Sequence, residues 1–230
     1  MKEIFDDYID NAFEGEYKQA DFKFGQFEKN YKALFPFDKK AFLLDIGIGR
    51  GEMLSCMKNW GYENYLGIDI SPSTVNFCRG LGLNCILVEN TVEWLADNQQ
   101  KFDLITLLDV LEHIKKNETI GFLQAVRAAL KLGGTVIIQV PNLQSPDGQL
   151  HRYNDFTHEF GYIEHSLGQV LKTAGFNQFE FRGFEEIVSG GFFYKILRKL
   201  YWNFVRFSRS ITGNINPAIL NPVFFTIVKK

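Results

Sequence analysis

Cysteine and histidine are scarce in this sequence of 230 residues, and its charges nearly cancel. The three cysteines (Cys56, Cys78 and Cys85) show no CxxC spacing, so we expect reduced thiols and neither disulfides nor a zinc site. Such thiols are typical of a cytoplasmic protein. The net charge of −2 gives no general attraction to nucleic acid, which disfavours a nucleic-acid-binding protein.

Long apolar runs are missing as well. No segment reaches the roughly 18 consecutive apolar residues that indicate a membrane-spanning helix. The N-terminal stretch is acidic and lacks the apolar core of a secretory signal. With 46% hydrophobic and 23% charged residues, the chain can nevertheless build a sizeable core.

Short apolar runs alternate with helical patterns over most of the chain. Strands are predicted at residues 41–47, 65–70, 84–89, 102–109, 135–142, 177–186 and 222–230. Helices are predicted between them at residues 52–60, 71–80, 91–100, 117–130 and 166–176, the last with Ser166 as its N-cap. This alternation predicts an α/β fold with a doubly wound, mostly parallel, seven-stranded sheet and an antiparallel C-terminal strand at its edge.

Two segments fall outside this alternation. Residues 1–40 are polar and aromatic at helical spacing, so we expect a helical lead-in that acts as a lid on a domain spanning residues 41–230. A helical insert is expected at about 188–220, and its residues 191–211 form a basic amphipathic helix. Packing on its own domain or a homodimer contact is the simpler interpretation of this helix. Docking on a membrane surface stays open.

A glycine-rich loop follows the first predicted strand. Gly47, Gly49 and Gly51 let the backbone turn sharply and approach a ligand closely. Glu52 stands where a dinucleotide fingerprint has its third glycine, and Asp45 precedes the loop, so both carboxylates would repel a pyrophosphate. The loop better suits a ligand that carries a cationic group near Asp45.

Five stretches carry a resemblance to a known family. LLDIGIGRGEML, NYLGIDIS, ILVENTVEWL, FDLITLLDVLEHI and LKLGGTVIIQVPN follow one another over about residues 40–185. Together they resemble class I S-adenosylmethionine-dependent methyltransferases, whose fold is Rossmann-like. The resemblance implies S-adenosyl-L-methionine as the cofactor and S-adenosyl-L-homocysteine as its product.

The resemblance also implies a set of cofactor-binding residues: Asp45, Gly47, Gly49, Gly51, Asp69, Ile70, Asn90, Leu108 and Asp109. Asp69 lies about 20 residues past the glycines, where a carboxylate can accept both hydroxyls of a ribose. Ile70 would pack on the adenine. Asn90 stands where the family usually has an aspartate, and its oxygen can still accept a bond from the adenine amine.

Polar segments after the fourth and fifth strands are expected to line the acceptor side of the crevice. Asp109, Glu112 and His113 share one face if a helical turn begins there. Some quinone-pathway methyltransferases place metal ligands at similar positions, but we expect no metal here. A structural or substrate-orienting role for His113 is the main alternative to a catalytic one. We predict His158, Asp109 and His113 as the catalytic residues.

Three of the four histidines lie between residues 151 and 165. Their segment, HRYNDFTHEF, resembles a methyltransferase subgroup associated with bacterial capsule and surface-polysaccharide pathways. His158 is predicted to be a general base or a substrate ligand, with a buried structural histidine as the alternative. Arg152 suits an acceptor that bears phosphate or carboxylate. The predicted substrate-binding residues are Arg152, Tyr153, Asp155, His158 and Asn142.

The leading interpretation is therefore an O-methyltransferase for a sugar hydroxyl or a phosphorylated precursor of a bacterial surface polysaccharide. Its partner would be a small-molecule or carbohydrate acceptor, and its location the cytoplasm or the inner face of the membrane. A quinone-type or other lipid methyltransferase is the second interpretation. A non-catalytic interaction module with a cofactor fold is the third. No NPPY-like motif follows the fourth strand, which disfavours a nucleic-acid methyltransferase.

Overall fold

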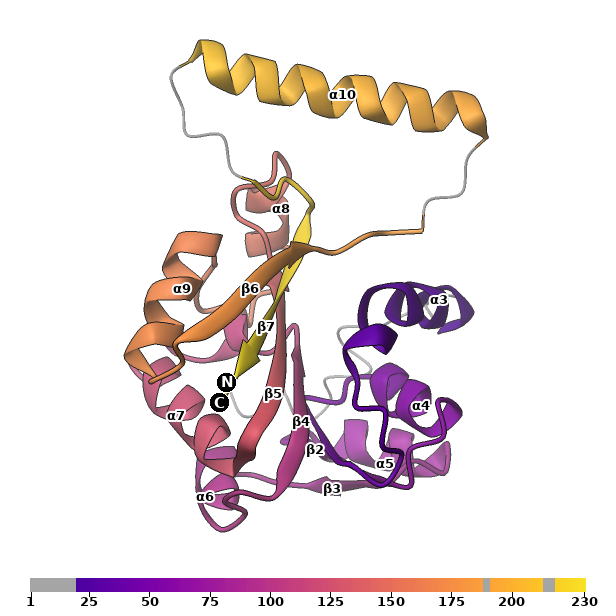
Figure 1. Cartoon of the computed structure of the whole chain (residues 1–230), viewed down its shortest axis with the longest axis vertical. Helices are drawn as coiled ribbons and strands as arrows, with labels where there is room; N and C mark the ends of the chain where they lie inside the picture. The colour runs from indigo at the N-terminus through magenta and orange to yellow at the C-terminus, as the bar shows by residue number, and fades with distance from the viewer. Residues whose placement is uncertain (1–19, 188–190, 213–217) are drawn as a thin grey trace.

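The computed structural model describes residues 20–187, 191–212 and 218–230, and it contains one seven-stranded sheet (Figure 1). The strand order is β3-β2-β1-β4-β5-β7-β6. The strands are β1 Phe42–Ile46, β2 Asn64–Asp69, β3 Cys85–Leu87, β4 Phe102–Leu108, β5 Leu130–Pro141, β6 Gln178–Gly183 and β7 Val223–Lys229. Strands β1 to β5 pair in parallel, whereas β7 is antiparallel to both of its neighbours. The predicted α/β fold class is confirmed.

Helices cover both faces of the sheet (Figure 1). The helices are α3 Ala20–Tyr31, η2 Lys32–Leu34, α4 Glu52–Asn59, α5 Pro72–Gly80, α6 Thr91–Ala96, η3 Leu111–His113, α7 Thr119–Ala129, α8 Gly148–Tyr153, α9 Glu164–Thr173 and α10 Phe192–Ile211. One core cluster joins α6, α7 and α9 to the sheet, and the other joins α3, α4 and α5 to its opposite face. This is the doubly wound arrangement expected when strands and helices alternate.

The position of β7 corrects one detail of the prediction. The C-terminal strand is antiparallel as expected, but it lies between β5 and β6, so β6 forms the edge. Phe224, Phe225, Thr226 and Val228 of β7 are all buried, which suits a strand covered on both faces. Strand β6 alternates between exposed and half-buried residues, as an edge strand can.

A second correction concerns the start of α9. Ser166 is not the N-cap. Ile163 holds that position, and the Oγ of Ser166, three residues into the helix, accepts a hydrogen bond from the backbone N–H of Ile163. The serine thus satisfies a helix-terminal amide from inside the helix. Gly175, with φ +94°, lies in the left-handed region just after the helix, where glycine is favoured.

Only part of the predicted lead-in falls within the described residues, since residues 1–19 lie outside them. Tyr31, at the end of α3, is fully buried and packs edge to face on Phe225, with ring centroids 5.1 Å apart. Helix α3 is therefore anchored to the sheet at its C-terminal end. Its role as a lid stays a prediction.

Helix α10 forms the predicted insert between β6 and β7. It lies beyond the carboxyl ends of the parallel strands, away from the two helical layers (Figure 1). Its apolar side chains do not pack on the domain: Phe193, Phe204 and Ile211 are 69%, 67% and 69% exposed. Packing of the apolar face on its own domain, one of the alternatives for this helix, does not fit this exposure, while a homodimer contact and membrane docking stay predictions. Among the described residues, no helix combines the length and the apolarity needed to span a bilayer.

Candidate active site

The glycine loop turns at the carboxyl end of β1. Gly47, Gly49 and Gly51 all have positive φ angles, of 74°, 49° and 76°. A Cβ atom on Gly47 would lie 2.4 Å from Cγ2 of Val110, and one on Gly51 would lie 2.5 Å from Leu83. A Cβ on Gly49 would meet nothing within 4 Å. Gly47 and Gly51 are thus needed for packing, while Gly49 leaves its backbone open to a ligand.

Asp45 lies under this loop, in the middle of the sheet between β2 and β4. Its side chain is only 2% exposed, and its Oδ1 accepts a hydrogen bond of 2.5 Å from Oγ1 of Thr106. Burial raises the pKa of the Asp45 carboxyl to about 8. A buried carboxyl of this kind is well suited to ionise when a cationic ligand group arrives.

Asp69 ends β2 beside the loop, as predicted. Its Oδ2 accepts from the backbone N–H of Ile48 at 2.9 Å, and its Oδ1 accepts from that of Ser71 at 2.8 Å. These bonds fix the carboxylate at the crevice, where the backbone N–H groups around it favour its ionised form. The next residue, Ile70, is 41% exposed and can pack on a flat ring.

Asn90 caps helix α6 through its side chain. Its Oδ1 accepts from the backbone N–H of Glu93 at 3.3 Å. An amide oxygen has two lone pairs, so the predicted bond to an adenine amine would be the second that this oxygen accepts. The residue is exposed at the carboxyl end of the sheet, beyond β3.

Asp109 directly follows β4 in a conformation that is rare for a residue other than glycine, with φ +55°. Its Oδ2 accepts a hydrogen bond of 2.8 Å from Nε2 of Gln139 on β5. The Oε1 of Gln139 in turn accepts from the hydroxyl of Tyr31. Gln139 thus connects the N-terminal helix to the residue at the end of β4. The half-buried Leu108 precedes Asp109.

His113 is held by the segment that follows α8. Its Nδ1 lies 2.8 Å from Oγ1 of the buried Thr157, and that hydroxyl donates its proton to Oδ1 of Asp155 at 2.6 Å. Because the single hydroxyl proton goes to Asp155, we assign the proton of this imidazole to Nδ1 and acceptor character to Nε2. Burial and the neighbouring His158 lower the pKa of His113 to about 4, so the ring is neutral near pH 7.

His158 meets His113 edge to face, with ring centroids 4.7 Å apart. The Nδ1 of His158 lies 2.9 Å from the backbone oxygen of His151, which can only accept, so this ring also carries its proton on Nδ1. In our assignment the neutral ring of His113 therefore offers an unprotonated Nε2. The predicted roles of His158 and His113 as catalytic residues fit this arrangement, and they stay predictions.

Glu112 is buried beside the two histidines. Within the part of the chain that the structure describes, neither of its carboxylate oxygens has a hydrogen-bond partner. Burial, followed by repulsion from Asp109, raises the pKa of this carboxyl well above its usual range. The ligand atoms of Glu112, His113 and His158 all lie within 4.8 Å of one another. The cluster predicted from spacing therefore contains His158 in place of Asp109.

The other predicted acceptor residues fall into two groups. Asp155 belongs to the histidine cluster through Thr157, while Tyr153 is 78% exposed beside it. The Nη2 of Arg152 donates to the backbone oxygen of Glu159 at 3.1 Å, and its guanidinium lies 5.2 Å from the centre of the Tyr153 ring. Arg152 therefore stabilises the segment between α8 and α9 and lies next to Tyr153.

Asn142 is placed differently from its predicted role. It is fully buried, its Nδ2 donates to the backbone oxygens of Ile219 and Asn221, and its Oδ1 accepts from the N–H of Gln144. All its hydrogen-bonding groups are used to hold the chain together after β5. Substrate binding by Asn142 does not fit this structure, because a fully bonded, buried amide has nothing to offer a ligand.

Two residues of this region escaped the sequence prediction. Thr157 joins Asp155 to His113 through its hydroxyl. Gln139 joins Asp109 to Tyr31. In the sequence it stands out only as a polar residue inside the apolar run TVIIQV. A buried polar side chain needs a hydrogen-bond partner, so the sequence predicts that Gln139 has one. The identity of the partners depends on strand pairing.

Comparison with known proteins identifies the fold family. A family model described as a methyltransferase domain matches residues 20–180. An S-adenosylmethionine-dependent methyltransferase from Archaeoglobus fulgidus superposes with a TM-score of 0.69 at 23% identity, covering 92% of this chain and 97% of that one. A 1,6-didemethyltoxoflavin-N1-methyltransferase from Burkholderia thailandensis, solved with S-adenosylhomocysteine, superposes with a TM-score of 0.53 at 16% identity, covering 83% and 71%. These structural matches support the shared fold.

Curated relatives match a shorter region. A ubiquinone biosynthesis O-methyltransferase from Cereibacter sphaeroides is 31% identical over 121 residues, which are 51% of this chain and 47% of the relative. A protein of the same name from Actinobacillus pleuropneumoniae is 30% identical over 115 residues, or 46% and 47%. The match thus spans about half the length of these relatives.

Proposed function

The chain belongs to the methyltransferase domain family, and on that premise we propose that it is an S-adenosylmethionine-dependent O-methyltransferase. The observation that carries the proposal is the neutral imidazole of His113, packed edge to face on His158 after strand β4. The open backbone at Gly49, the buried Asp45 and the Asp69 carboxylate fit the methionine and ribose parts of the cofactor.

When bound, the cofactor supplies a methyl group activated by a sulfonium. The residues of the chain then have to align the acceptor with that methyl group and keep water out. Asp45 would hold the amino group, Asp69 the ribose, and Ile70, Asn90 and Leu108 the adenine side. Gln139 holds the carboxylate of Asp109 after β4, where it would face both cofactor and acceptor.

The histidine pair would take the proton of the acceptor hydroxyl. A neutral imidazole with an unprotonated Nε2 can accept that proton as the oxygen attacks the methyl group. In our assignment Thr157 and Asp155 keep the Nδ1 proton of His113 in place, so Nε2 stays the basic atom. Either ring can act as the base, and the other then orients the hydroxyl.

For the acceptor we propose an aromatic hydroxyl of a quinone precursor. This choice is supported by the curated relatives, which are named ubiquinone biosynthesis O-methyltransferases. The sugar hydroxyl favoured by the HRYNDFTHEF pattern has no counterpart among these names. A phenolic hydroxyl also loses its proton more readily than a sugar hydroxyl, which suits bases of imidazole strength.

The proposal is tested by measuring S-adenosylhomocysteine formation with two acceptor sets, ortho-dihydroxyphenyl compounds and sugar nucleotides. We expect turnover with the phenolic set. Turnover with sugar nucleotides alone would restore the polysaccharide interpretation. Calorimetry that shows no binding of either S-adenosylmethionine or S-adenosylhomocysteine would indicate a non-catalytic interaction module.

The Glu112, His113 and His158 cluster also requires a metal test, since its ligand atoms are close enough to share an ion. We expect turnover to survive dialysis against EDTA, because a neutral His113 needs no ion to act as a base. Loss of turnover that is restored by Mg²⁺, Mn²⁺ or Zn²⁺ would make the cluster a metal site instead.

A further inference from the structure

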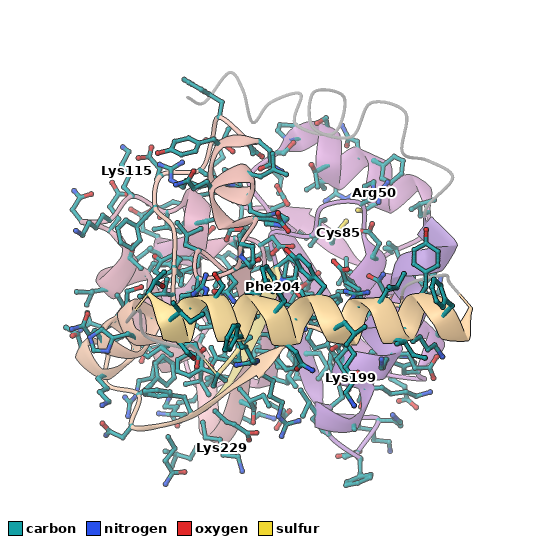
Figure 2. The ribbon with its side chains drawn as sticks, turned by 90° about the horizontal axis from the view of Figure 1, so that it is seen from above. Arg50, Cys85, Lys115, Lys199, Phe204 and Lys229 are labelled. Atoms are coloured by element: carbon teal, nitrogen blue, oxygen red, sulfur yellow. The ribbon has the colours of Figure 1, made fainter. Side chains whose placement is uncertain are left out.

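Helix α10 presents a continuous apolar stripe on the side that faces away from the domain. The stripe follows helical spacing and consists of Phe193, Ile196, Leu197, Leu200, Phe204, Phe207 and Ile211. Each of these side chains is at least 40% exposed, and four of them exceed 60%. Figure 2 looks onto α10 from above and labels Phe204 on it. An exposed apolar strip of this length indicates a binding surface rather than chance exposure.

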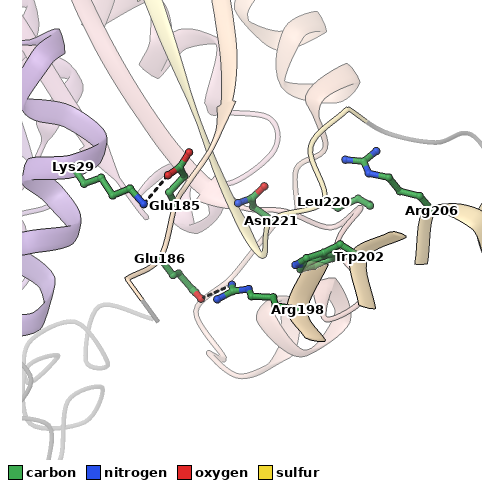
Figure 3. Close-up of a pocket in the computed structure, with 8 residues that line it drawn as sticks. All are labelled: Lys29, Glu185, Glu186, Arg198, Trp202, Arg206, Leu220 and Asn221. Atoms are coloured by element: carbon green, nitrogen blue, oxygen red, sulfur yellow. Dashed lines mark hydrogen bonds and ion pairs between the residues drawn. The ribbon is translucent and has the colours of Figure 1, made fainter. Parts of the chain in front are cut away.

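The opposite side of α10 faces the domain and combines two arginines with Trp202 and the half-buried Val205. Arg198, Trp202 and Arg209 lie on this side and are less exposed than the stripe. The Nη2 of Arg198 lies 3.5 Å from a carboxylate oxygen of Glu186, and the Nη2 of Arg209 donates to the backbone oxygen of Gln144 at 2.6 Å. A cleft of about 400 Å³ separates this side of the helix from the domain (Figure 3). The contacts of Arg198 and Arg209 thus hold the helix on the domain, and the apolar stripe faces away from it.

The charge on α10 has one sign only. Its sequence contains Lys195, Arg198, Lys199, Arg206 and Arg209 and no acidic residue, in a chain whose net charge is −2. Lys195 and Lys199 are exposed, and neither forms an ion pair with the residues that the structure describes. Two copies of α10 packed stripe to stripe would offer the exposed Lys195 and Lys199 no acidic residue of the partner helix, so charge complementarity does not favour self-association.

We propose that α10 docks on the surface of a bilayer that contains anionic phospholipid. The stripe would enter the boundary between headgroups and acyl chains, while the long side chains of Lys195 and Lys199, which share one side of the helix, extend toward the lipid phosphates. Several aromatic residues, Phe193, Phe204 and Phe207 among them, suit that boundary. The helix lies in the membrane plane and does not cross the bilayer.

Docking through α10 would also bring the acceptor side of the domain to the membrane. Arg209 ties the helix to Gln144, in the segment between β5 and α8. Helix α10 lies beyond the carboxyl ends of the parallel strands, where the cofactor and acceptor residues lie (Figure 1). The docking itself does not depend on which acceptor is methylated, so it can be tested without an activity assay.

The test is flotation of the full-length chain with vesicles of phosphatidylcholine, alone or with phosphatidylglycerol. We expect binding to the mixed vesicles and little binding to phosphatidylcholine. Replacing two stripe residues, Phe204→Ser with Phe207→Ser, should abolish binding. Lys195→Gln with Lys199→Gln should weaken it by about fivefold for each lysine and reduce its salt dependence.

Matched controls distinguish docking through α10 from nonspecific vesicle binding by exposed apolar side chains. Phe37→Ser with Leu132→Ser removes two apolar side chains that are 100% and 84% exposed outside α10, and should leave vesicle binding unchanged. Circular dichroism and sedimentation of each variant check its fold and oligomeric state. No flotation of the wild-type chain with the mixed vesicles would overturn the proposal. A wild-type dimer that the Phe204 and Phe207 substitutions convert to a monomer, without vesicle binding, would assign the stripe to a second copy.

Discussion

The imidazole rings of His113 and His158 meet edge to face with their centroids 4.7 Å apart, and each carries its Nδ1 proton toward an oxygen of the segment after β5. Replacing either ring with alanine should lower turnover by about 10²-fold or more, because a general base contributes that much. Cofactor affinity by calorimetry should stay nearly constant. His165→Ala, at an exposed position on α9, serves as the control. A parallel fall in cofactor affinity would make the rings structural.

Thr157 is expected to act through His113 rather than on the acceptor. Thr157→Val keeps the shape of the side chain but removes the hydroxyl that joins His113 to Asp155. Turnover should fall and the pH profile should change, because the proton on Nδ1 is no longer fixed, while Thr157→Ser should restore both. Equal loss with serine and valine would show that packing, not the hydroxyl, matters.

Stability should depend on pH through His113. Its pKa is about 4 in the folded protein, below the 6.5 of an exposed histidine. The unfolded chain therefore binds more protons between these values, and the free energy of unfolding should fall as pH drops from 6.5 to 4. The loss should reach about 3 kcal/mol. Urea titrations of the wild type and of His113→Gln measure it, and identical pH dependence in both would refute this role.

Asp45 should release a proton when the cofactor binds. Its pKa of about 8 leaves it mostly protonated at pH 7 without ligand, and a cationic amino group beside it would favour the ionised form. Affinity for S-adenosylmethionine should therefore rise with pH up to about 8. Calorimetry in buffers of different ionisation enthalpy counts the proton. Asp45→Asn should bind more weakly and release none, and net proton uptake by the wild type at pH 7 would contradict the assignment.

The glycine loop allows folding and binding to be separated. Gly47→Ala should destabilise the fold, since its Cβ would lie 2.4 Å from Val110. Gly49→Ala meets no atom, so its cost should be confined to the positive φ, about 1 kcal/mol. Its new methyl group would stand in the space left for the ligand. Gly49→Ala should therefore fold and lose cofactor affinity, as thermal melts and calorimetry can show.

Much of the fold was accessible from the sequence because its signals are local. The alternation of apolar runs with helical patterns placed all seven strands, and the glycines with Asp69 marked the crevice. The position of β7 was not accessible, since nothing local to residues 222–230 states which strands it pairs with. An apolar run buried on both faces was the one hint that it is not an edge strand.

The site was accessible in part for the same reason. His113 and His158 could be singled out by residue type, but their contact depends on how the segment after β5 folds back. Asn142 is predicted from the sequence to bind substrate, but its side-chain amide instead donates hydrogen bonds to the backbone oxygens of Ile219 and Asn221. The amphipathic pattern of α10 is the same whether its apolar face meets protein or lipid. Only its polar contacts with Glu186 and Gln144 show which side is held.

The central place of β7 has a consequence for how this chain folds. Strands β5 and β6 have no common neighbour until β7 arrives, and β7 follows α10 in the chain. Pairing Thr135 with Lys229 closes a long loop, whose entropy is lost before the contact is gained. Until β7 pairs with β5, the backbone N–H and C=O groups on that edge of β5 are unpaired. This strand is rich in valine and isoleucine. Pairing of β7 with β5 therefore also covers the strand edge through which β5 could otherwise pair with another chain.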